Sequence, residues 1–420
     1  MSPIRLLLVA PPFSGHLNPL IALAKRLRER GFAPHFVTGP ARIPLLHALG
    51  FPAEPVLAHD PTALESIADT PYPVRGNPVR LGRQLAANLA LLPTVKAELE
   101  GIFERTRPDV VLADFTAPVA GLVADAVGVP WVTAMCTPFA LETRRGTPSY
   151  CGGWGPPRHF GHHVRDALGR GATRFVKRSF GVVFHRQLTA LGTTIYRPDG
   201  SEAAYSPRVI LGLGLAELEF PRDWPAAFEM IGPVTEAPEP TPELPDFLKV
   251  DRPRILVTLG THLQWAKRDL PERLSRLTVA FPDHQFVLTL GRPHAGPIVP
   301  RPAGRNLLIC DYLPYDPFLP HFAAVIHHGG AGIVYSTLRA GKPALVWPRD
   351  YDQFDYAARL VARGVGVAVS EISAPSAVAA LRRVLAGLDG TARTELAAAV
   401  ARTDPFGATE RVLRAYRPWP

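Results

Sequence analysis

The sequence predicts an α/β protein of two domains, each built around a parallel β-sheet. Short apolar runs typical of buried strands alternate with amphipathic stretches typical of helices, first over residues 6–134 and again from residue 255. The 420 residues exceed what one hydrophobic core usually serves, and 47% of them are hydrophobic, which is enough for two cores. Between the two blocks, residues 235–253 are rich in proline and acidic residues, as in an extended linker.

The first block opens with a strand, a helix and a second strand. Residues 6–10 form a short apolar run, and the loop after it ends in Asn18 and Pro19, a pair that favours the N-terminus of a helix. That helix is expected to end at Gly31, and residues 34–38 are expected to form the next strand. This order of elements is typical of a parallel sheet.

The remaining elements continue the alternation. In the first block, strands are expected at residues 110–113, 131–134 and 209–213, and helices at 84–104 and 117–127. Residues 142–190 break the pattern, with one basic helix expected at 171–191. In the second block, strands are expected at 255–259, 285–290, 307–310, 323–326, 344–347 and 365–369, and helices at 375–387, 392–402 and 408–416. We therefore divide the chain into a domain at 1–234, the linker at 235–253, a domain at 254–406 and a last helix within 407–420.

The net charge of +9 is unevenly distributed along the chain. Residues 144–186 contain nine basic residues and one acidic residue, Asp166. Two interpretations remain open: a solvated basic face, or a surface that attracts an acidic acceptor or an anionic membrane. Nucleic acid is a weaker candidate, because no recognition motif and no repeated aromatic platform accompanies the charge.

The cysteine pattern is typical of a protein from a reducing compartment, and the apolar runs are too short for targeting or membrane segments. The three cysteines, Cys136, Cys151 and Cys310, lie far apart and form neither a disulfide nor a metal-binding pattern. The apolar run at residues 6–10 meets two prolines and precedes no cleavage site, so no signal peptide is expected. No run is long enough to span a bilayer, and we expect a cytoplasmic protein.

Residues 327–353, HHGGAGIVYSTLRAGKPALVWPRDYDQ, carry the clearest chemical signal. An apolar strand delivers two histidines to a glycine turn, and an amphipathic helix is expected at residues 333–340. The glycines let the backbone approach a ligand closely, and the N–H groups at the start of a helix favour an anion. His328 can donate a hydrogen bond to a phosphate oxygen at such a site. A second strand then leads to Asp352 and Gln353, whose carboxylate and amide suit a polyhydroxylated ligand.

The order and spacing of HHGGAG, GKP, a strand and DQ resemble the donor signature of a glycosyltransferase family that includes plant and bacterial nucleotide-sugar-dependent enzymes. The resemblance covers nearly the whole chain, because a second family element lies near the N-terminus. It implies two Rossmann-like domains that face a central cleft (the GT-B fold), with the last helix crossing back to the first domain. It also implies sugar transfer from a nucleotide sugar.

The resemblance implies a role for each residue of the donor signature. His328, Gly330, Gly332, Ile333 and Thr261 would bind the donor diphosphate, Tyr312 and Leu313 the base, Ser336 the ribose, and Asp352 and Gln353 the donor sugar. A simple turn is an equal alternative for Thr261, and core packing is one for Tyr312. His327 should point away from His328 and is interpreted as a packed residue. Ser336 stands where many relatives carry glutamate, so a thymidine diphosphate donor is an alternative to a uridine diphosphate donor.

His16 and Asp114 are the candidate catalytic pair. His16 lies just past the end of the first strand, where open parallel sheets present their ligands, and Asp114 ends a later strand. Histidine is the natural base near neutral pH, and a carboxylate on its far nitrogen would fix the tautomer and stabilise the imidazolium. The alternative is that each residue only caps the helix after it. The resemblance agrees with catalysis, since GHLNP matches the family's catalytic histidine motif and VVLADF matches the strand whose aspartate is its partner.

Two other motifs point to chemistry that we do not expect. Asp350, Tyr351 and Asp352 spell the D-x-D pattern by which a different glycosyltransferase fold holds a metal ion. Here the pattern follows a strand beside a phosphate-binding helix, so no metal dependence is expected. GLGLAE at Gly212 begins like a dinucleotide fingerprint but lacks the third glycine, which makes a nicotinamide enzyme improbable.

The sequence thus predicts an inverting glycosyltransferase that moves a sugar from a UDP- or dTDP-sugar to a hydroxyl of a bulky, partly hydrophobic small molecule, as in natural-product biosynthesis. No cofactor or metal is expected, and the protein is expected to be a monomer or a homodimer. A membrane-associated lipid or sterol glycosyltransferase is the nearest alternative. A nucleotide-sugar epimerase or a non-catalytic binding protein on the same fold is a further one.

Overall fold

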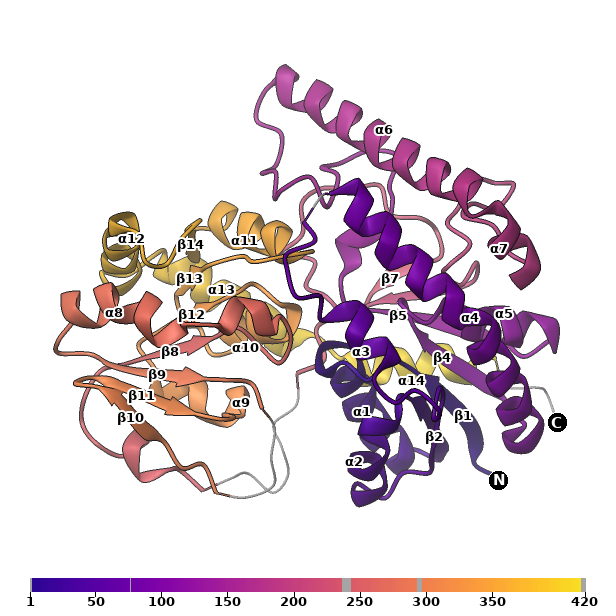
Figure 1. Cartoon of the computed structure of the whole chain (residues 1–420), viewed down its shortest axis with the longest axis horizontal. Coiled ribbons are helices and arrows are strands. Elements are labelled where there is room, and N and C mark those ends of the chain that lie inside the picture. The colour runs from indigo at the N-terminus through magenta and orange to yellow at the C-terminus, as the bar shows by residue number, and fades with distance from the viewer. Residues whose placement is uncertain (1, 76, 236–242, 293–296, 417–420) are drawn as a thin grey trace.

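The computed structural model describes residues 2–75, 77–235, 243–292 and 297–416. Figure 1 shows two α/β halves side by side, each with its own sheet, and both chain ends at the first half. The first sheet has the strand order β3-β2-β1-β4-β5-β6-β7, and the second has β10-β11-β9-β8-β12-β13-β14. The predicted fold class, two Rossmann-like α/β domains with parallel sheets, is confirmed.

The first sheet is parallel at every printed pairing. Its strands are β1 (Ile4–Val9), β2 (Phe32–Thr38), β3 (Ala53–Pro55), β4 (Val110–Asp114), β5 (Trp131–Met135), β6 (Ile210–Gly212) and β7 (Phe228–Met230). The helices of this half are α1 (Ser14–Glu29), α2 (Ile43–Ala48), α3 (Ala63–Ala68), α4 (Pro78–Thr106), α5 (Pro118–Ala126), α6 (Phe160–Val183) and α7 (His185–Leu191).

The second sheet is parallel except at its edge, where β10 runs antiparallel to β11. Its strands are β8 (Arg254–Thr258), β9 (Gln285–Thr289), β10 (Arg301–Gly304), β11 (Leu307–Cys310), β12 (Ala324–His327), β13 (Ala344–Val346) and β14 (Gly366–Ala368). Its helices are α8 (Leu270–Ala280), α9 (Tyr315–Phe318), α10 (Ala331–Arg339), α11 (Gln353–Ala362), α12 (Pro375–Leu385) and α13 (Gly390–Arg402). Short 3-10 turns occur at Pro40–Arg42, Pro138–Ala140, Asp246–Leu248, Gln264–Lys267 and Leu319–His321.

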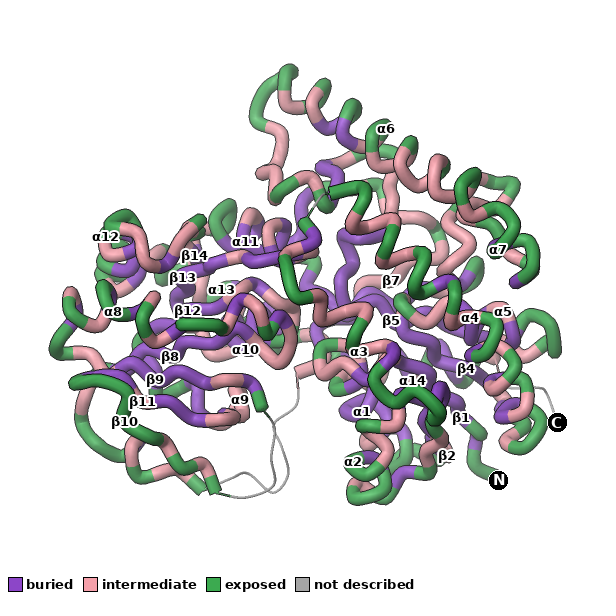
Figure 2. Tube along the Cα trace, viewed as in Figure 1, coloured by how far each residue is buried: buried purple, intermediate pink, exposed green. Residues whose placement is uncertain are grey.

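Each sheet is buried on both faces, as Figure 2 shows by the purple strands inside green and pink helices. On β1, Leu6 and Leu8 pack into one apolar cluster with α1, while Leu7 and Val9 pack into another with α4 and α5. Burial on both faces explains why these strands read as continuous apolar runs rather than as alternating patterns.

The last helix, α14 (Pro405–Arg414), packs on the first half of the chain. Val412 and Leu413 are buried in the cluster that contains α1, and Arg30 bonds Glu410 at 2.7 Å. The chain therefore ends against its own first helix, as the resemblance implies. Of the predicted linker, residues 236–242 lie outside the described residues.

Several predicted elements are wrong at their boundaries, and α4, expected from residue 84, begins at Pro78. Helix α1 begins at Ser14 and contains Pro19, so Asn18 is not its N-cap. Burial of Leu17 and Leu20 in the core outweighs the local preference of the Asn-Pro pair. The expected helix at 171–191 is two helices, and α6 already begins at Phe160.

Several short elements of the structure were not predicted. Residues 40–80, whose prolines obscure the pattern, contain α2, α3 and the edge strand β3. Strands β7 and β10 were also not predicted, and each has only three or four residues at an edge of its sheet. Among the described residues, no helix has both the length and the apolar character needed to cross a membrane.

Candidate active site

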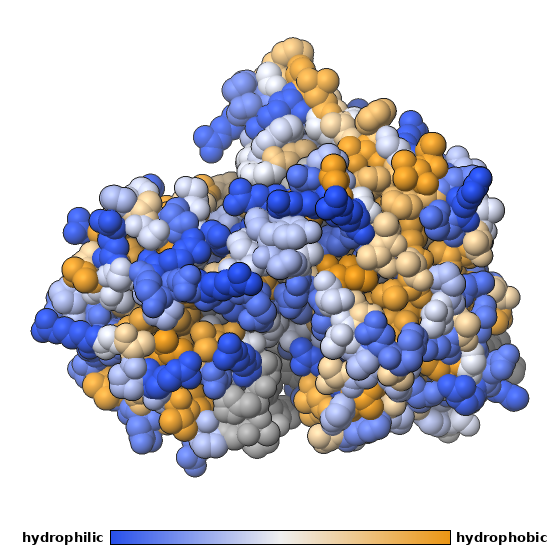
Figure 3. Space-filling view, viewed as in Figure 1, coloured by the Kyte–Doolittle hydropathy of each residue, from blue (hydrophilic) through white to orange (hydrophobic). Residues whose placement is uncertain are grey.

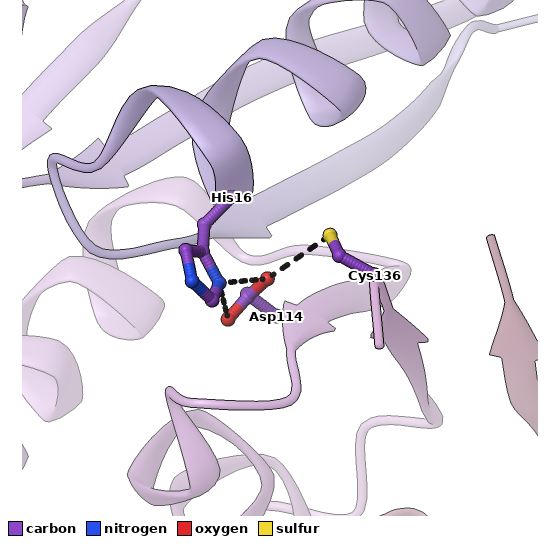
Figure 4. A group of neighbouring side chains, drawn as sticks. All are labelled: His16, Asp114 and Cys136. Atoms are coloured by element: carbon purple, nitrogen blue, oxygen red, sulfur yellow. Dashed lines mark hydrogen bonds and ion pairs between the residues drawn. The ribbon is translucent and has the colours of Figure 1, made fainter. Parts of the chain in front are cut away.

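His16 and Asp114 lie side by side because their strands are neighbours. β1 pairs with β4 in parallel, with Val9 opposite Ala113, so both strands end at the same edge of the sheet. His16 is in the first turn of α1, directly after β1, and Asp114 is the last residue of β4. Nδ1 of His16 lies 3.0 and 3.1 Å from the two carboxylate oxygens of Asp114. Figure 4 shows the two side chains pointing toward one another.

The Asp114 carboxylate is held in place by a further set of donors. The backbone N–H and the hydroxyl of Thr116 both donate to its Oδ1, at 2.9 and 2.5 Å. The thiol of Cys136, which follows β5, lies 3.9 Å from its Oδ2. Because the carboxylate is completely buried and bonded on both oxygens, its position relative to His16 is fixed.

His16 has the electrostatics of a base that is easily protonated. Burial alone would lower the pKa of the imidazole, but the negative charge and hydrogen bond of Asp114, with the charge of Asp352, raise it above the ordinary value of 6.5. The Nδ1–H donates to Asp114, which leaves Nε2 as the nitrogen that can accept a proton. A quarter of the His16 side chain is exposed, so a ligand can reach it.

His16, Asp114 and Cys136 are close enough together to be considered as a metal site. Burial and the charges of Asp114 and Asp352 raise the pKa of the Cys136 thiol well above its ordinary value. A thiol must lose its proton to bind a metal, and here the environment opposes that loss. The contact is therefore better described as an S–H group that donates to the carboxylate.

The donor signature forms the turn that its sequence predicts, at the corresponding edge of the second sheet. β12 pairs with β8, with His327 opposite Thr258, so the two strands end together. Gly329 has a φ of +93°, which favours glycine, and Gly330 is the N-cap of α10. The N–H groups of the first turn of α10 therefore follow directly after His328.

The ring of His328 lies between two glycine backbones. A Cβ atom on Gly330 would lie 2.5 Å from Nε2 of His328, and one on Gly260 would lie 2.8 Å from Cε1. Burial, with the nearby charge of Lys267, lowers the pKa of His328 to about 3. The ring is therefore neutral, and it can contribute a hydrogen-bond donor but no charge of its own. His327 is fully buried, as predicted, and its Nδ1 accepts from the N–H of Gly329.

Lys267 is a candidate donor-site residue that the sequence analysis did not identify. The charge of its ammonium lowers the pKa of His328, and the same group donates a hydrogen bond to the carbonyl of Leu290 at 2.9 Å. Burial lowers the pKa of Lys267 to about 8. A half-buried cation beside the α10 turn suits a diphosphate. No sequence motif surrounds this lysine, and only the fold brings it next to His328.

Asp352 and Gln353 lie at the start of α11, where both side chains already have partners. The Asp352 carboxylate accepts from the hydroxyl of Thr137 at 2.8 Å, and burial raises its pKa above the ordinary value. Oε1 of Gln353 accepts from the backbone N–H groups of Arg349 and Asp350, at 2.8 and 3.1 Å. A sugar hydroxyl would therefore meet the second oxygen of Asp352 and the amide nitrogen of Gln353.

The other residues predicted to bind the donor differ in how far their side chains are buried. Thr261 follows Gly260 and is partly exposed, and Gly332 has open space beside its Cα. Ile333, Leu313 and Ser336 are buried, and the first two belong to one apolar cluster. The side chains of Ile333 and Leu313 are therefore part of the core, which leaves only their backbones for the predicted donor contacts. Tyr312 is half-buried, and burial raises its pKa while the charge of Arg42 from the first half opposes the shift.

The two groups of residues meet across the boundary between the halves. The ring of Phe13 contacts His16 at 6.0 Å and His262, next to Thr261, at 4.9 Å between centroids. The negative charge of Asp352 also raises the pKa of His16. The candidate base His16, the candidate sugar-binding residue Asp352 and the candidate diphosphate-binding turn before α10 are thus close together.

The two aspartates of the D-x-D pattern bond different partners. The Asp350 carboxylate accepts from the N–H groups of Val74 and Arg75, both at 2.6 Å, whereas the Asp352 carboxylate bonds Thr137. The hydroxyl of Tyr351, between them, accepts from Gln84 at 2.8 Å. The two carboxylates therefore contact different parts of the first half.

Comparison with known proteins points to one family. Residues 277–406 match the family described as erythromycin biosynthesis protein CIII-like, C-terminal domain. A zeaxanthin glucosyltransferase of Pantoea ananas is 26% identical over 402 residues, 91% of this chain and 88% of that protein. The solved glycotransferase of kitacinnamycin has a TM-score of 0.72 at 22% identity, with 100% of both chains covered. The spinosyn rhamnosyltransferase SpnG, solved with thymidine diphosphate, has a TM-score of 0.66 at 20% identity over 98% of this chain and 100% of that one.

The likeness extends over both halves of the chain, as the relative and the two solved structures show by their coverage. The family model overlaps α10 and α11, which carry the donor signature. The chain therefore has the GT-B fold, and it is similar over most of its length to glycosyltransferases, including those of bacterial natural-product biosynthesis.

Proposed function

We propose that this glycosyltransferase homologue transfers a sugar, with inversion, from a UDP- or dTDP-sugar to a hydroxyl of a bulky, partly hydrophobic small molecule. The observation that carries the proposal is the His16–Asp114 pair, with Asp352 acting on the same imidazole. Direct displacement requires a general base, residues that hold the sugar and a site that binds the leaving diphosphate. In this proposal these are His16, Asp352 and the turn before α10.

In the proposed reaction, Nε2 of His16 accepts the proton of the acceptor hydroxyl as its oxygen attacks the anomeric carbon. The bond from that carbon to the diphosphate oxygen breaks on the opposite face, so the configuration inverts. Asp114 stabilises the imidazolium that forms. The leaving diphosphate carries the electron pair away and is met by the N–H groups at the start of α10, a hydrogen bond from His328 and the charge of Lys267.

The identities of donor and acceptor are supported by separate observations. Ser336 offers no carboxylate for two ribose hydroxyls, and the related SpnG was solved with thymidine diphosphate, so we favour a dTDP-sugar over a UDP-sugar. The relative from Pantoea ananas is named for an apolar small molecule, zeaxanthin. We infer no metal requirement, because helix α10 and Lys267 supply positive potential and the D-x-D carboxylates bond the protein.

Binding of nucleoside diphosphates tests the proposal directly. Calorimetry with thymidine, uridine and guanosine diphosphates is expected to show binding of a pyrimidine nucleotide. His328→Ala is expected to weaken that binding by about tenfold to hundredfold, because a hydrogen bond to a charged group is lost. His321→Ala, which removes an exposed histidine from the same half, is the matched control and should bind as the unmodified protein does. Equal binding by the His328 variant, or no binding at all, would refute the assignment of this site.

The pH dependence tests the role of His16. Since its pKa is raised above 6.5 and the base must be unprotonated, kcat/KM should fall about tenfold per pH unit on the acidic side, with a midpoint above 6.5. In Asp114→Asn the negative charge that favours the imidazolium is gone, so the midpoint should move to lower pH while the plateau rate falls. An acidic limb unaffected by Asp114→Asn would show that a different group titrates. The measurement is kcat/KM against pH for both proteins.

A further inference from the structure

Helix α6 turns three charged side chains toward the protein, those of Arg170, Arg174 and Lys177. Lys177 bonds the carboxylates of Glu142 and Glu202, at 2.9 and 2.5 Å. Arg170 donates to the carbonyl of Gly146, in the loop after β5, and Arg174 donates to that of Gly200, in the loop between α7 and β6, at 2.5 and 3.0 Å. An amphipathic helix normally directs its apolar face to the core and its charges to solvent. In α6 these three charged side chains contact the protein instead, while several large apolar side chains are exposed.

The opposite side of α6 carries a continuous apolar stripe. Phe160, Val164, Leu168, Phe175 and Val182 are spaced by four or seven residues, which returns each to the same side of a helix. We call these five residues the outer stripe. Leu168, Phe175 and Val182 are 69%, 71% and 79% exposed.

The pictures place this stripe on an open edge of the molecule. α6 lies along the top of the first half, away from both sheets (Figure 1), and most of it is exposed or intermediate (Figure 2). Orange hydrophobic side chains gather at the same edge in Figure 3. Contiguous apolar surface of this kind marks a place of interaction.

The surroundings of the outer stripe are positively charged. The exposed ionisable residues on and beside α6 and α7 are Arg158, His159, His163, Arg178, His185 and Arg186. The acid among residues 143–198 is Asp166, which is buried against Arg165 and Thr147. A partner that covers the stripe must therefore accept apolar side chains and basic neighbours together.

From this arrangement we infer that the outer stripe is a peripheral binding surface for an anionic lipid bilayer. The apolar side chains enter the boundary between headgroups and acyl chains, and the arginines contact the lipid phosphates, with α6 in the plane of the membrane. A second copy of the chain is a poorer occupant, because a two-fold contact would place the basic rims of both copies together. The inference stands apart from the proposed glycosyl transfer.

Cosedimentation of the full chain with vesicles tests this inference. Vesicles of phosphatidylglycerol and phosphatidylcholine in equal parts should carry the protein down, and vesicles of phosphatidylcholine alone should carry far less. The double variant Leu168→Ser, Phe175→Ser should bind at least about tenfold more weakly, since two buried apolar side chains are lost. Arg178→Ser should bind about fivefold more weakly. Val279→Ser, at a 79% exposed position of α8, is the matched control and should bind unchanged.

Three outcomes would contradict membrane binding by the outer stripe, and a fourth would assign the stripe to a different partner. Failure to bind the anionic vesicles, equal binding to both kinds of vesicle, or unchanged binding by the double variant would overturn the inference. A concentration-dependent dimer on gel filtration that disappears in the double variant would assign the stripe to a second copy instead. Nucleoside diphosphate binding should be normal in every variant, which shows that the fold is intact and keeps this test separate from that of the proposed function.

Discussion

Replacing His16 by alanine is expected to lower kcat for sugar transfer by about a hundredfold to ten-thousandfold while nucleoside diphosphate affinity is retained. The imidazole contacts Asp114 and aromatic rings of the first half, whereas the candidate diphosphate contacts belong to the second half. Rate and affinity should therefore separate in this variant. Steady-state kinetics, with calorimetry on the same protein, measures both.

Two further variants make the His16 result specific. His59→Ala removes an exposed histidine from the same half and should leave kcat unchanged. Asp114→Asn keeps the shape of the buried partner but removes its charge, so it should lower kcat by less than His16→Ala does. Full activity in His16→Ala would eliminate this histidine as the base, and a joint loss of rate and nucleotide affinity would indicate a structural role.

Replacing Glu219 by alanine is expected to destabilise the protein by about 3–5 kcal/mol, because it leaves the buried charge of Arg359 without its counterion. Nε and Nη2 of Arg359 donate to one oxygen of Glu219 at 3.0 and 2.9 Å, and both side chains are almost completely buried. The guanidinium also lies over the rings of Phe139 and Phe220, at 3.9 and 4.6 Å. Urea unfolding measures the loss.

The controls for Glu219 use a nearby exposed pair and an apolar replacement. Glu217 pairs with Arg402 at 3.6 Å with both side chains at least half exposed, so Glu217→Ala should change stability by less than about 1 kcal/mol. The double variant Glu219→Leu, Arg359→Met should recover most of the lost stability, because no unpaired charge remains. A small effect of Glu219→Ala alone would mean that water reaches the guanidinium.

The strands and the contact between His16 and Asp114 could be predicted because their signals are local. A strand buried on both faces, such as β4, reads as an uninterrupted apolar run, and a polar residue at its end lies at the ligand edge of the sheet. His16 and Asp114 follow from this rule although 98 residues separate them. The glycine turn before α10 was predictable for the same reason, since backbone conformation limits the choice of residue there.

The misplaced and missed features depend on contacts between distant segments. The extent of α6 was wrong partly because its apolar residues face outward, so their periodicity does not mark a core. Gly169 within it lowers helix propensity, but a Cβ there would lie 2.6 Å from the Trp154 ring, so packing requires the glycine. Lys267 lies near His328 because of the fold of the second half, and Thr137 bonds Asp352 because of the arrangement of the two halves. No local sequence pattern encodes either contact.

The bonds that join the D-x-D segment to the first half have a consequence for how such enzymes can be recombined. Asp350 and Asp352, on either side of Tyr351, bond residues 74–75 and Thr137. Arg359, in the helix α11 that follows, bonds Glu219. The segment that would select the donor sugar is therefore positioned by the half that would select the acceptor. A hybrid made by exchanging one half with a relative inherits compatible specificities only if these partners are exchanged with it, so the two selectivities of this fold are not independent modules.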